Sequence, residues 1–81
     1  MGDPTLRTDL GRVLVTGGSG FVGTNLVTTL LERGHHVRSC DRVGSPLPDH
    51  PRLEVIDGDI CDADAVAAAV DGIDTVFHTA A

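Results

Sequence analysis

Short apolar segments alternate with polar ones along this chain. Val13, Leu14 and Val15 form a continuous apolar run of strand length, which is typical of a strand buried on both faces. Comparable segments recur further along, each bounded by glycine, proline or charged residues. The pattern therefore predicts four β-strands, at residues 12–16, 36–41, 52–57 and 74–79.

Two segments between these strands have apolar residues at helical spacing. Residues 20–33 are expected to form a helix with an apolar stripe facing a sheet, and Gly34 stands where a left-handed residue would end it. Residues 63–70 are rich in alanine and predict a second, short helix, with Asp62 as its N-cap and Gly72 at its end. The stripe of the first helix consists of Val22, Leu26, Leu30, Val27 and Leu31.

Strands that alternate with helices or loops indicate an α/β fold with a parallel sheet. Residues 42–51 contain three prolines and a glycine and are expected to be a loop. With right-handed crossovers the strand order would be 3-2-1-4, which corresponds to the first four strands of a doubly wound Rossmann-type sheet. Because the last expected strand reaches the end of the chain, we expect an incomplete fold, the N-terminal fragment of a larger enzyme.

The turn between the first strand and the first helix is rich in glycine. Gly17, Gly20 and Gly23 have the spacing G-x-x-G-x-x-G. In a strand–turn–helix context this is a dinucleotide-binding signature, because the glycines permit a tight turn, close approach of a diphosphate and close packing of the helix. The diphosphate would lie against free N–H groups of Gly20, Phe21 and Val22 at the positive end of the helix dipole. Residues 11–81 are therefore interpreted as part of a dinucleotide-binding domain, and residues 1–10 as a flexible arm.

Two charged residues lie at the carboxyl end of the second expected strand, where Asp41 is the last strand residue and Arg42 follows it. Asp41 lies about 20 residues after the glycine turn, where a carboxylate can accept hydrogen bonds from the adenosine ribose. It would also disfavour a 2′-phosphate, because unit charges about 4 Å apart repel by about 4 kcal/mol at an effective dielectric of about 20. NAD is accordingly favoured over NADP. Arg42 acts in the opposite direction, since a guanidinium can hold a 2′-phosphate or stack on adenine.

The ends of the third and fourth strands supply further candidates. Asp59 can accept a hydrogen bond from the adenine amino group, while Ile60 covers the ring. Ala80 and Ala81 are small enough to let a cofactor ribose approach the backbone. His78, within an apolar run, is interpreted as a hydrogen-bonded core residue rather than a base.

Composition limits the chemistry that the chain can perform alone. It has no Tyr and no Lys, so all six basic residues are arginines, and the net charge is −6. That charge argues against nucleic acid or an anionic membrane as partner, and no apolar run reaches transmembrane length. Cys40 and Cys61 lack metal-ligand spacing and are expected to be free thiols in a reducing cytoplasm.

In combination these features resemble the extended short-chain dehydrogenase/reductase family, the NAD-dependent epimerase/dehydratase superfamily. The similarity covers about residues 11–81 and is closest to the 3β-hydroxysteroid dehydrogenase branch, particularly the bacterial cholesterol dehydrogenase type. It implies that Ala80 and Ala81 lie toward the nicotinamide, and that the full-length protein oxidises a 3β-hydroxysteroid with NAD. The family's catalytic Tyr-x-x-x-Lys pair would lie beyond these 81 residues. The motifs that carry the resemblance are Thr16–Gly23, Asp41, Gly58–Ile60 and His78–Ala81.

Two alternatives share these motifs. One is a sugar-nucleotide epimerase or dehydratase of the same superfamily, which only the substrate-binding part would distinguish. The other is a non-catalytic nucleotide-sensing protein that keeps the glycine turn without the catalytic pair. A P-loop NTPase is excluded because no lysine follows the glycines.

Overall fold

The computed structural model describes residues 10–42, 44–58 and 62–79, which form a four-stranded parallel sheet with two helices. The sheet has the order β3-β2-β1-β4. The predicted fold class and strand order are therefore confirmed. Apart from Leu10, the expected N-terminal arm lies outside the described residues. The elements are β1 (Val13–Thr16), α1 (Phe21–Glu32), β2 (Val37–Asp41), β3 (Leu53–Asp57), α2 (Ala63–Val70) and β4 (Thr75–His78).

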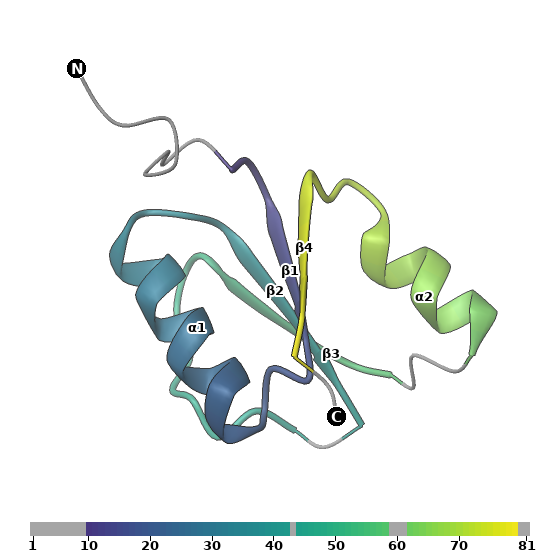
Figure 1. Cartoon of the computed structure of the whole chain (residues 1–81), viewed down its shortest axis with the longest axis horizontal. Helices are drawn as coiled ribbons and strands as arrows, with labels where there is room; N and C mark the ends of the chain where they lie inside the picture. The colour runs from purple at the N-terminus through teal and green to yellow at the C-terminus, as the bar shows by residue number, and fades with distance from the viewer. Residues whose placement is uncertain (1–9, 43, 59–61, 80–81) are drawn as a thin grey trace.

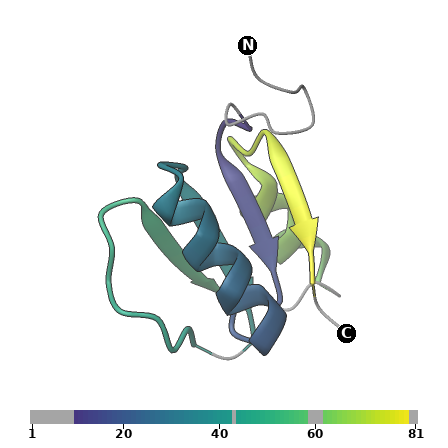
Figure 2. The same cartoon turned by 60° about the vertical axis from the view of Figure 1, so that its left-hand side comes forward.

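The two helices cover opposite faces of the sheet (Figures 1 and 2). Successive side chains of a strand point to opposite faces, so β1 contributes to both layers. Val13 and Val15 pack in the core beneath α1, with Val27 among their neighbours. Leu14 faces the other way and packs with Cys40 and Ala69. The central strand is thereby buried on both sides, as its continuous apolar run predicts.

The apolar stripe of α1 is buried in its middle and at its end but not at its start. Val27, Leu30 and Leu31 are buried, whereas Val22 is 63% exposed. The expectation that Val22 packs on the sheet is wrong. The helix begins at Phe21, so Val22 belongs to the first turn, where Phe21 and Val22 are exposed and Gly23 is buried.

Arg38 in β2 and Arg52, directly before β3, hold the carboxyl-terminal ends of the two helices. The guanidinium of Arg52 donates to the carbonyl of Leu31 at 2.6 Å. Arg38 donates to the carbonyls of Ala69 at 2.9 Å and Asp71 at 2.7 Å. Cations at these positions also complement the helix dipole. Both helices are thus anchored at one edge of the sheet, and their N-termini are presented at the other.

Over the described ranges, no helix is long and apolar enough to cross a lipid bilayer.

Candidate dinucleotide-binding site

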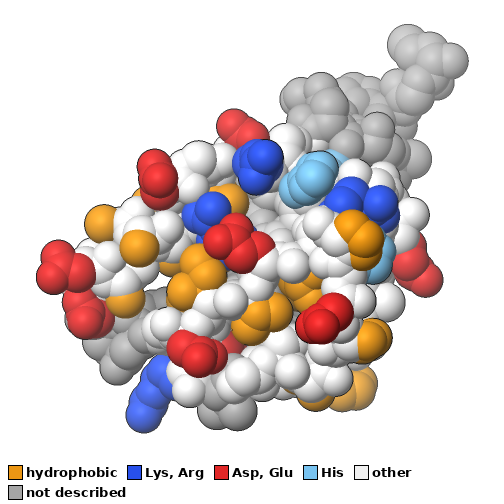
Figure 3. Space-filling view, turned by 180° about the vertical axis from the view of Figure 1, so that it is seen from behind, with side chains coloured by type: hydrophobic (Ala, Val, Ile, Leu, Met, Phe, Trp, Pro, Cys, Tyr) orange, Lys and Arg blue, Asp and Glu red, His pale blue; other side chains and the backbone are white. Residues whose placement is uncertain are grey.

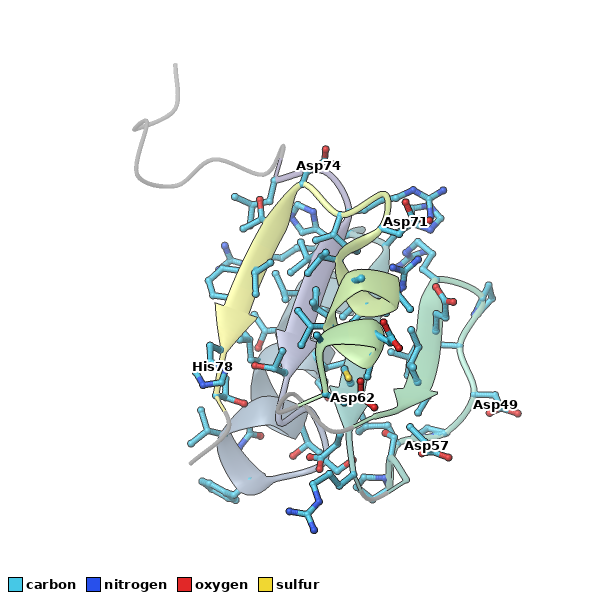
Figure 4. The ribbon with its side chains drawn as sticks, turned by 90° about the vertical axis from the view of Figure 1, so that its right-hand side faces the viewer. Asp49, Asp57, Asp62, Asp71, Asp74 and His78 are labelled. Carbon is cyan, nitrogen blue, oxygen red and sulfur yellow. The ribbon has the colours of Figure 1, made fainter. Side chains whose placement is uncertain are left out.

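All four strands are parallel, so their carboxyl ends meet at one edge of the sheet. Figure 4 shows Asp57, Asp62 and His78 toward this edge and Asp71 and Asp74 at the opposite one. β1 lies between β2 and β4, with α1 and α2 on different faces. In open α/β sheets, ligands bind at the point where the order of the strands reverses, which here lies between β1 and β4. The glycine turn of residues 17–20 leaves β1 at this point.

Gly17 begins the turn in a conformation that requires glycine. Its φ is +75°, in the left-handed region that other residues rarely adopt. Its N–H donates to the carbonyl of Cys40 at 2.8 Å, and its carbonyl accepts from the N–H of Gly20 at 3.1 Å. The chain can therefore turn off the strand while remaining bonded to β2.

Gly23 permits the close packing of α1 on this turn. A Cβ at position 23 would lie 2.1 Å from the carbonyl oxygen of Gly17 and 2.8 Å from the Cα of Gly18. Both are backbone atoms that cannot move aside. The closest approach is thus to the turn at the end of β1, which is more specific than the close approach to the sheet expected from sequence.

Gly20 is not required by contacts within the described part of the protein. Its φ is −80°, and an added Cβ would meet only the Gly17 carbonyl at an ordinary 3.5 Å. A glycine here leaves room in front of the helix, as close approach of a diphosphate requires. The expectation that its N–H is free is wrong, because that group donates to Gly17 within the turn.

The N-terminus of α1 is open in the described structure. The first helical bond runs from the N–H of Thr24 to the carbonyl of Gly20 at 2.8 Å, so the N–H groups of Phe21, Val22 and Gly23 precede it. Among the residues that the structure describes, no side chain caps this end, and its first turn has no acidic residue. Phe21 is 85% exposed. An anion could therefore approach these N–H groups at the positive end of the dipole.

Asp41 lies beside the glycine turn. Its Oδ2 accepts a hydrogen bond from the N–H of Ser19 at 3.1 Å, although the two residues are far apart in sequence. Its carbonyl accepts from the N–H of Gly58 at 3.0 Å, which ties the ends of β2 and β3 together. Arg42 is exposed next to it. The structure thus brings the expected ribose-binding carboxylate against the expected diphosphate loop.

Four of the expected site residues, Asp59, Ile60, Ala80 and Ala81, lie outside the described residues. Their described neighbours Gly58 and Thr79 follow β3 and β4 at the edge that carries the turn.

Sequence reasoning missed two threonines at the reversal point. The hydroxyl of Thr79 donates to the carbonyls of Thr16 at 2.7 Å and Gly17 at 3.2 Å. The hydroxyl of Thr16 is hydrogen-bonded to Nδ1 of His78 at 2.6 Å. Both threonines lie within motifs that carry the family resemblance, Thr16–Gly23 and His78–Ala81, but nothing in these motifs predicts the hydrogen bonds of their hydroxyls. His78 has a partner as expected but is exposed, so its interpretation as a core residue is wrong.

Gly18 lies close to Ser39, which is another contact that the sequence does not predict. A Cβ at position 18 would lie 1.9 Å from the Oγ of Ser39, a buried residue of β2. The second glycine of the turn therefore allows the turn to rest directly on β2.

Cys40 and Asp62 have structural roles near the site. Cys40 is a buried free thiol whose pKa is raised by burial and, to a smaller extent, by the negative charges of Asp41 and Asp57. It therefore stays protonated near neutral pH and acts as a packing residue. Asp62 is the N-cap of α2 as predicted, since its carboxylate accepts from the N–H groups of Asp64 and Ala65.

The opposite edge of the sheet contains most of the described arginines. A cavity of about 180 Å³ there is lined by Arg12, Arg38, Arg52 and other residues. In Figure 3 most visible basic and histidine side chains lie in the upper half of the face. Arg38 is paired with Glu54 at 2.9 Å, and Arg38 and Arg52 also bind helix carbonyls. Within the described ranges, no group of three or more His, Cys, Asp or Glu residues is placed to hold a metal ion.

The sheet order, the glycine turn and the uncapped helix define a Rossmann-type α/β fold. Residues 13–81 match the NAD dependent epimerase/dehydratase family, and the chain belongs to this family.

Two curated relatives are similar to this chain over its whole length. The chain is 78% identical over 81 residues to a 3-beta-hydroxysteroid dehydrogenase of Mycolicibacterium neoaurum, a match that covers 100% of this chain and 22% of that protein. It is 75% identical over 81 residues to the 3 beta-hydroxysteroid dehydrogenase/Delta 5-->4-isomerase of Mycobacterium tuberculosis (strain H37Rv), with the same coverage of both. The chain thus spans about a fifth of the length of these curated relatives.

A solved structure supports the fold. The Bordetella bronchiseptica enzyme WbmH in complex with NAD+ matches with a TM-score of 0.80 and 38% identity, over 88% of this chain and 26% of that one.

Proposed function

We propose that this chain forms the NAD-binding half-site of an oxidoreductase that oxidises a 3β-hydroxysteroid to the ketosteroid. The observation that carries the proposal is the uncapped N-terminus of α1, held over the glycine turn and beside Asp41. The high identity to two mycobacterial proteins with hydroxysteroid dehydrogenase names supports the substrate class.

Each residue of the site has a proposed role in binding NAD. The N–H groups of Phe21 and Val22 bind the diphosphate, and Gly20 gives it room. Gly17 and Gly23 shape the turn that places those groups. The remaining roles are assigned from sequence: Asp41 at the adenosine ribose, Arg42 stacking on adenine or holding a 2′-phosphate, Asp59 and Ile60 at adenine, and Ala80 and Ala81 toward the nicotinamide.

The chain binds and orients but does not by itself catalyse. NAD, when bound, supplies the acceptor for the hydride that leaves the substrate carbinol carbon. The hydroxyl proton needs a general base, and the Tyr-x-x-x-Lys pair that would serve has no counterpart among these 81 residues. We place the pair in the rest of the full-length protein. We also place that protein in the cytoplasm, a reducing compartment that suits Cys40 as a buried free thiol.

The substrate class is tested with the full-length protein that carries this segment. Incubation with NAD and a 3β-hydroxysteroid should give NADH and the 3-ketosteroid in equal amounts. Turnover of a UDP-sugar instead would favour the epimerase or dehydratase alternative. NAD binding without turnover of either substrate would favour the nucleotide-sensing alternative.

The ribose role of Asp41 is tested by cofactor selectivity. Asp41→Ala removes the carboxylate that opposes a 2′-phosphate, so the ratio of kcat/KM for NAD over NADP should fall about tenfold, a change of about 1.4 kcal/mol. Asp57→Ala is the matched control, because Asp57 occupies the paired position on β3 and is exposed. Unchanged selectivity in Asp41→Ala, or an equal change in both variants, would refute the role.

A further inference from the structure

The hydroxyl of Thr79 is hydrogen-bonded to the end of β1 and to the first residue of the glycine turn. It donates to the carbonyls of Thr16 at 2.7 Å and Gly17 at 3.2 Å. Strand pairing does not need these bonds, because the backbone N–H of Thr79 already donates to Thr16 at 2.9 Å. The hydroxyl adds a contact directed at the first peptide of the turn.

The Gly17 carbonyl that receives this contact is the most constrained group of the turn. It accepts from Thr79 and from the N–H of Gly20 at 3.1 Å. It also lies where a Cβ on Gly23 would clash. The orientation of the Gly17 carbonyl therefore affects three contacts: with Thr79 after β4, with Gly20 in the turn, and with Gly23 in the first turn of α1.

Peptide direction matters in a loop that binds an anion. The C=O and N–H of a trans peptide point in opposite directions, so fixing the Gly17 carbonyl also fixes the N–H of Gly18. A carbonyl that rotated toward a bound diphosphate would repel it, whereas N–H groups attract it. A donor that holds the carbonyl in place pre-organises the loop for an anion.

We propose that Thr79 is a positioning residue for the cofactor loop, which it holds in its binding conformation through the carbonyls of Thr16 and Gly17. The proposal rests on the proposed NAD site and extends it to a residue on a different strand. Thr79 also directly precedes Ala80 and Ala81, so it would link the diphosphate end of the site to the strand end proposed for the nicotinamide side.

The test uses three variants of the full-length protein. Thr79→Val keeps the shape and removes the hydroxyl, and Thr79→Ser keeps the hydroxyl. Thr75→Val is the matched control, because Thr75 begins β4, the strand that Thr79 follows, and its hydroxyl donates to the carbonyl of Leu10 at 2.8 Å, away from the turn. Melting temperature, KM for NAD, kcat and the inhibition constant of ADP-ribose are measured for each.

Thr79→Val should raise KM for NAD and the inhibition constant of ADP-ribose about five- to tenfold, which corresponds to the loss of about one hydrogen bond. The kcat should change less than about twofold, because the chemical step is not touched. Thr79→Ser should restore both constants. Thr75→Val should match Thr79→Val in melting temperature but leave the NAD constants unchanged.

Three results would overturn the proposal. These are an equal change of the NAD constants in both valine variants, failure of Thr79→Ser to restore them, and unchanged NAD constants in Thr79→Val. Failure of the proposed function would look different, because the unmodified protein would then fail to oxidise a 3β-hydroxysteroid with NAD. Failure of the NAD site itself would abolish ADP-ribose binding to the unmodified protein.

Discussion

The two helices begin at the same edge of the sheet, but their N-termini are completed in different ways (Figures 1 and 4). α2 is capped by Asp62, whose carboxylate accepts from the N–H groups of Asp64 and Ala65, and Asp64 adds a second negative charge in the first turn. α1 has Gly20 at the same position, where no described side chain forms a cap, and its first turn has no acidic residue.

The difference separates a structural helix end from a binding one. Both ends carry the partial positive charge of a helix dipole and N–H groups without helical partners. In α2 the chain satisfies them with its own carboxylate. In α1 no described side chain satisfies these N–H groups, and the turn in front of them contains three glycines, Gly17, Gly18 and Gly20. A ligand anion can replace the missing cap only at α1.

The largest expected effect comes from making α1 resemble α2. Gly20→Asp places a carboxylate where the diphosphate would approach, and φ of −80° accepts the side chain. Affinity for NAD should fall at least about 100-fold, because like charges about 4 Å apart repel by about 4 kcal/mol at an effective dielectric of about 20, before salt screening. Stability should rise by about 0.3–1 kcal/mol, since an acid at a helix N-terminus is favourable.

The two readouts for Gly20→Asp are NAD titration and thermal unfolding of the full-length protein. A variant that unfolds at a higher temperature and still binds NAD within twofold of the original affinity would show that α1 does not hold the diphosphate.

The second effect concerns the turn itself. Gly23→Ala puts a Cβ against backbone atoms of Gly17 and Gly18, so overpacking should cost about 1–3 kcal/mol of stability and weaken NAD binding as well. Gly44→Ala is the control, because a Cβ there meets nothing within 4 Å. Urea unfolding compares the two, and equal midpoints would contradict the close packing of α1 on the turn.

The smallest effect comes from removing the cap of α2. Asp62→Ala should destabilise the protein by about 1 kcal/mol, the usual contribution of an N-cap side chain. KM for NAD should stay within twofold. A loss of NAD affinity as large as that of Gly20→Asp would mean that the ligand uses α2 and that the comparison between the helices is wrong.

Much of the fold could be predicted because local rules agree with the tertiary structure. The alanine-rich segment with Asp62 before it forms α2 with the expected bounds, since capping is a local property. The strand order follows from the alternation of strands and crossovers. The glycine spacing and the offset of Asp41 predicted two groups that the structure brings together through Ser19.

Some errors arise in the geometry of the glycine turn and the start of α1, and others arise where a residue's surroundings depend on distant parts of the chain. Val22 matches the apolar stripe but is exposed because it lies in the first turn of α1. The N–H of Gly20 is used because the turn folds back on Gly17. His78 is exposed although its strand is apolar, and the bonds from Thr79 join residues more than 60 positions apart. No local pattern encodes such contacts.

The position of the diphosphate tests the central claim most directly. In a crystal structure of the full-length protein with NAD, the diphosphate oxygens should lie within hydrogen-bond distance of the N–H groups of Phe21 and Val22, with Asp62 still capping α2. A diphosphate bound elsewhere, with the first turn of α1 open to solvent, would contradict the account.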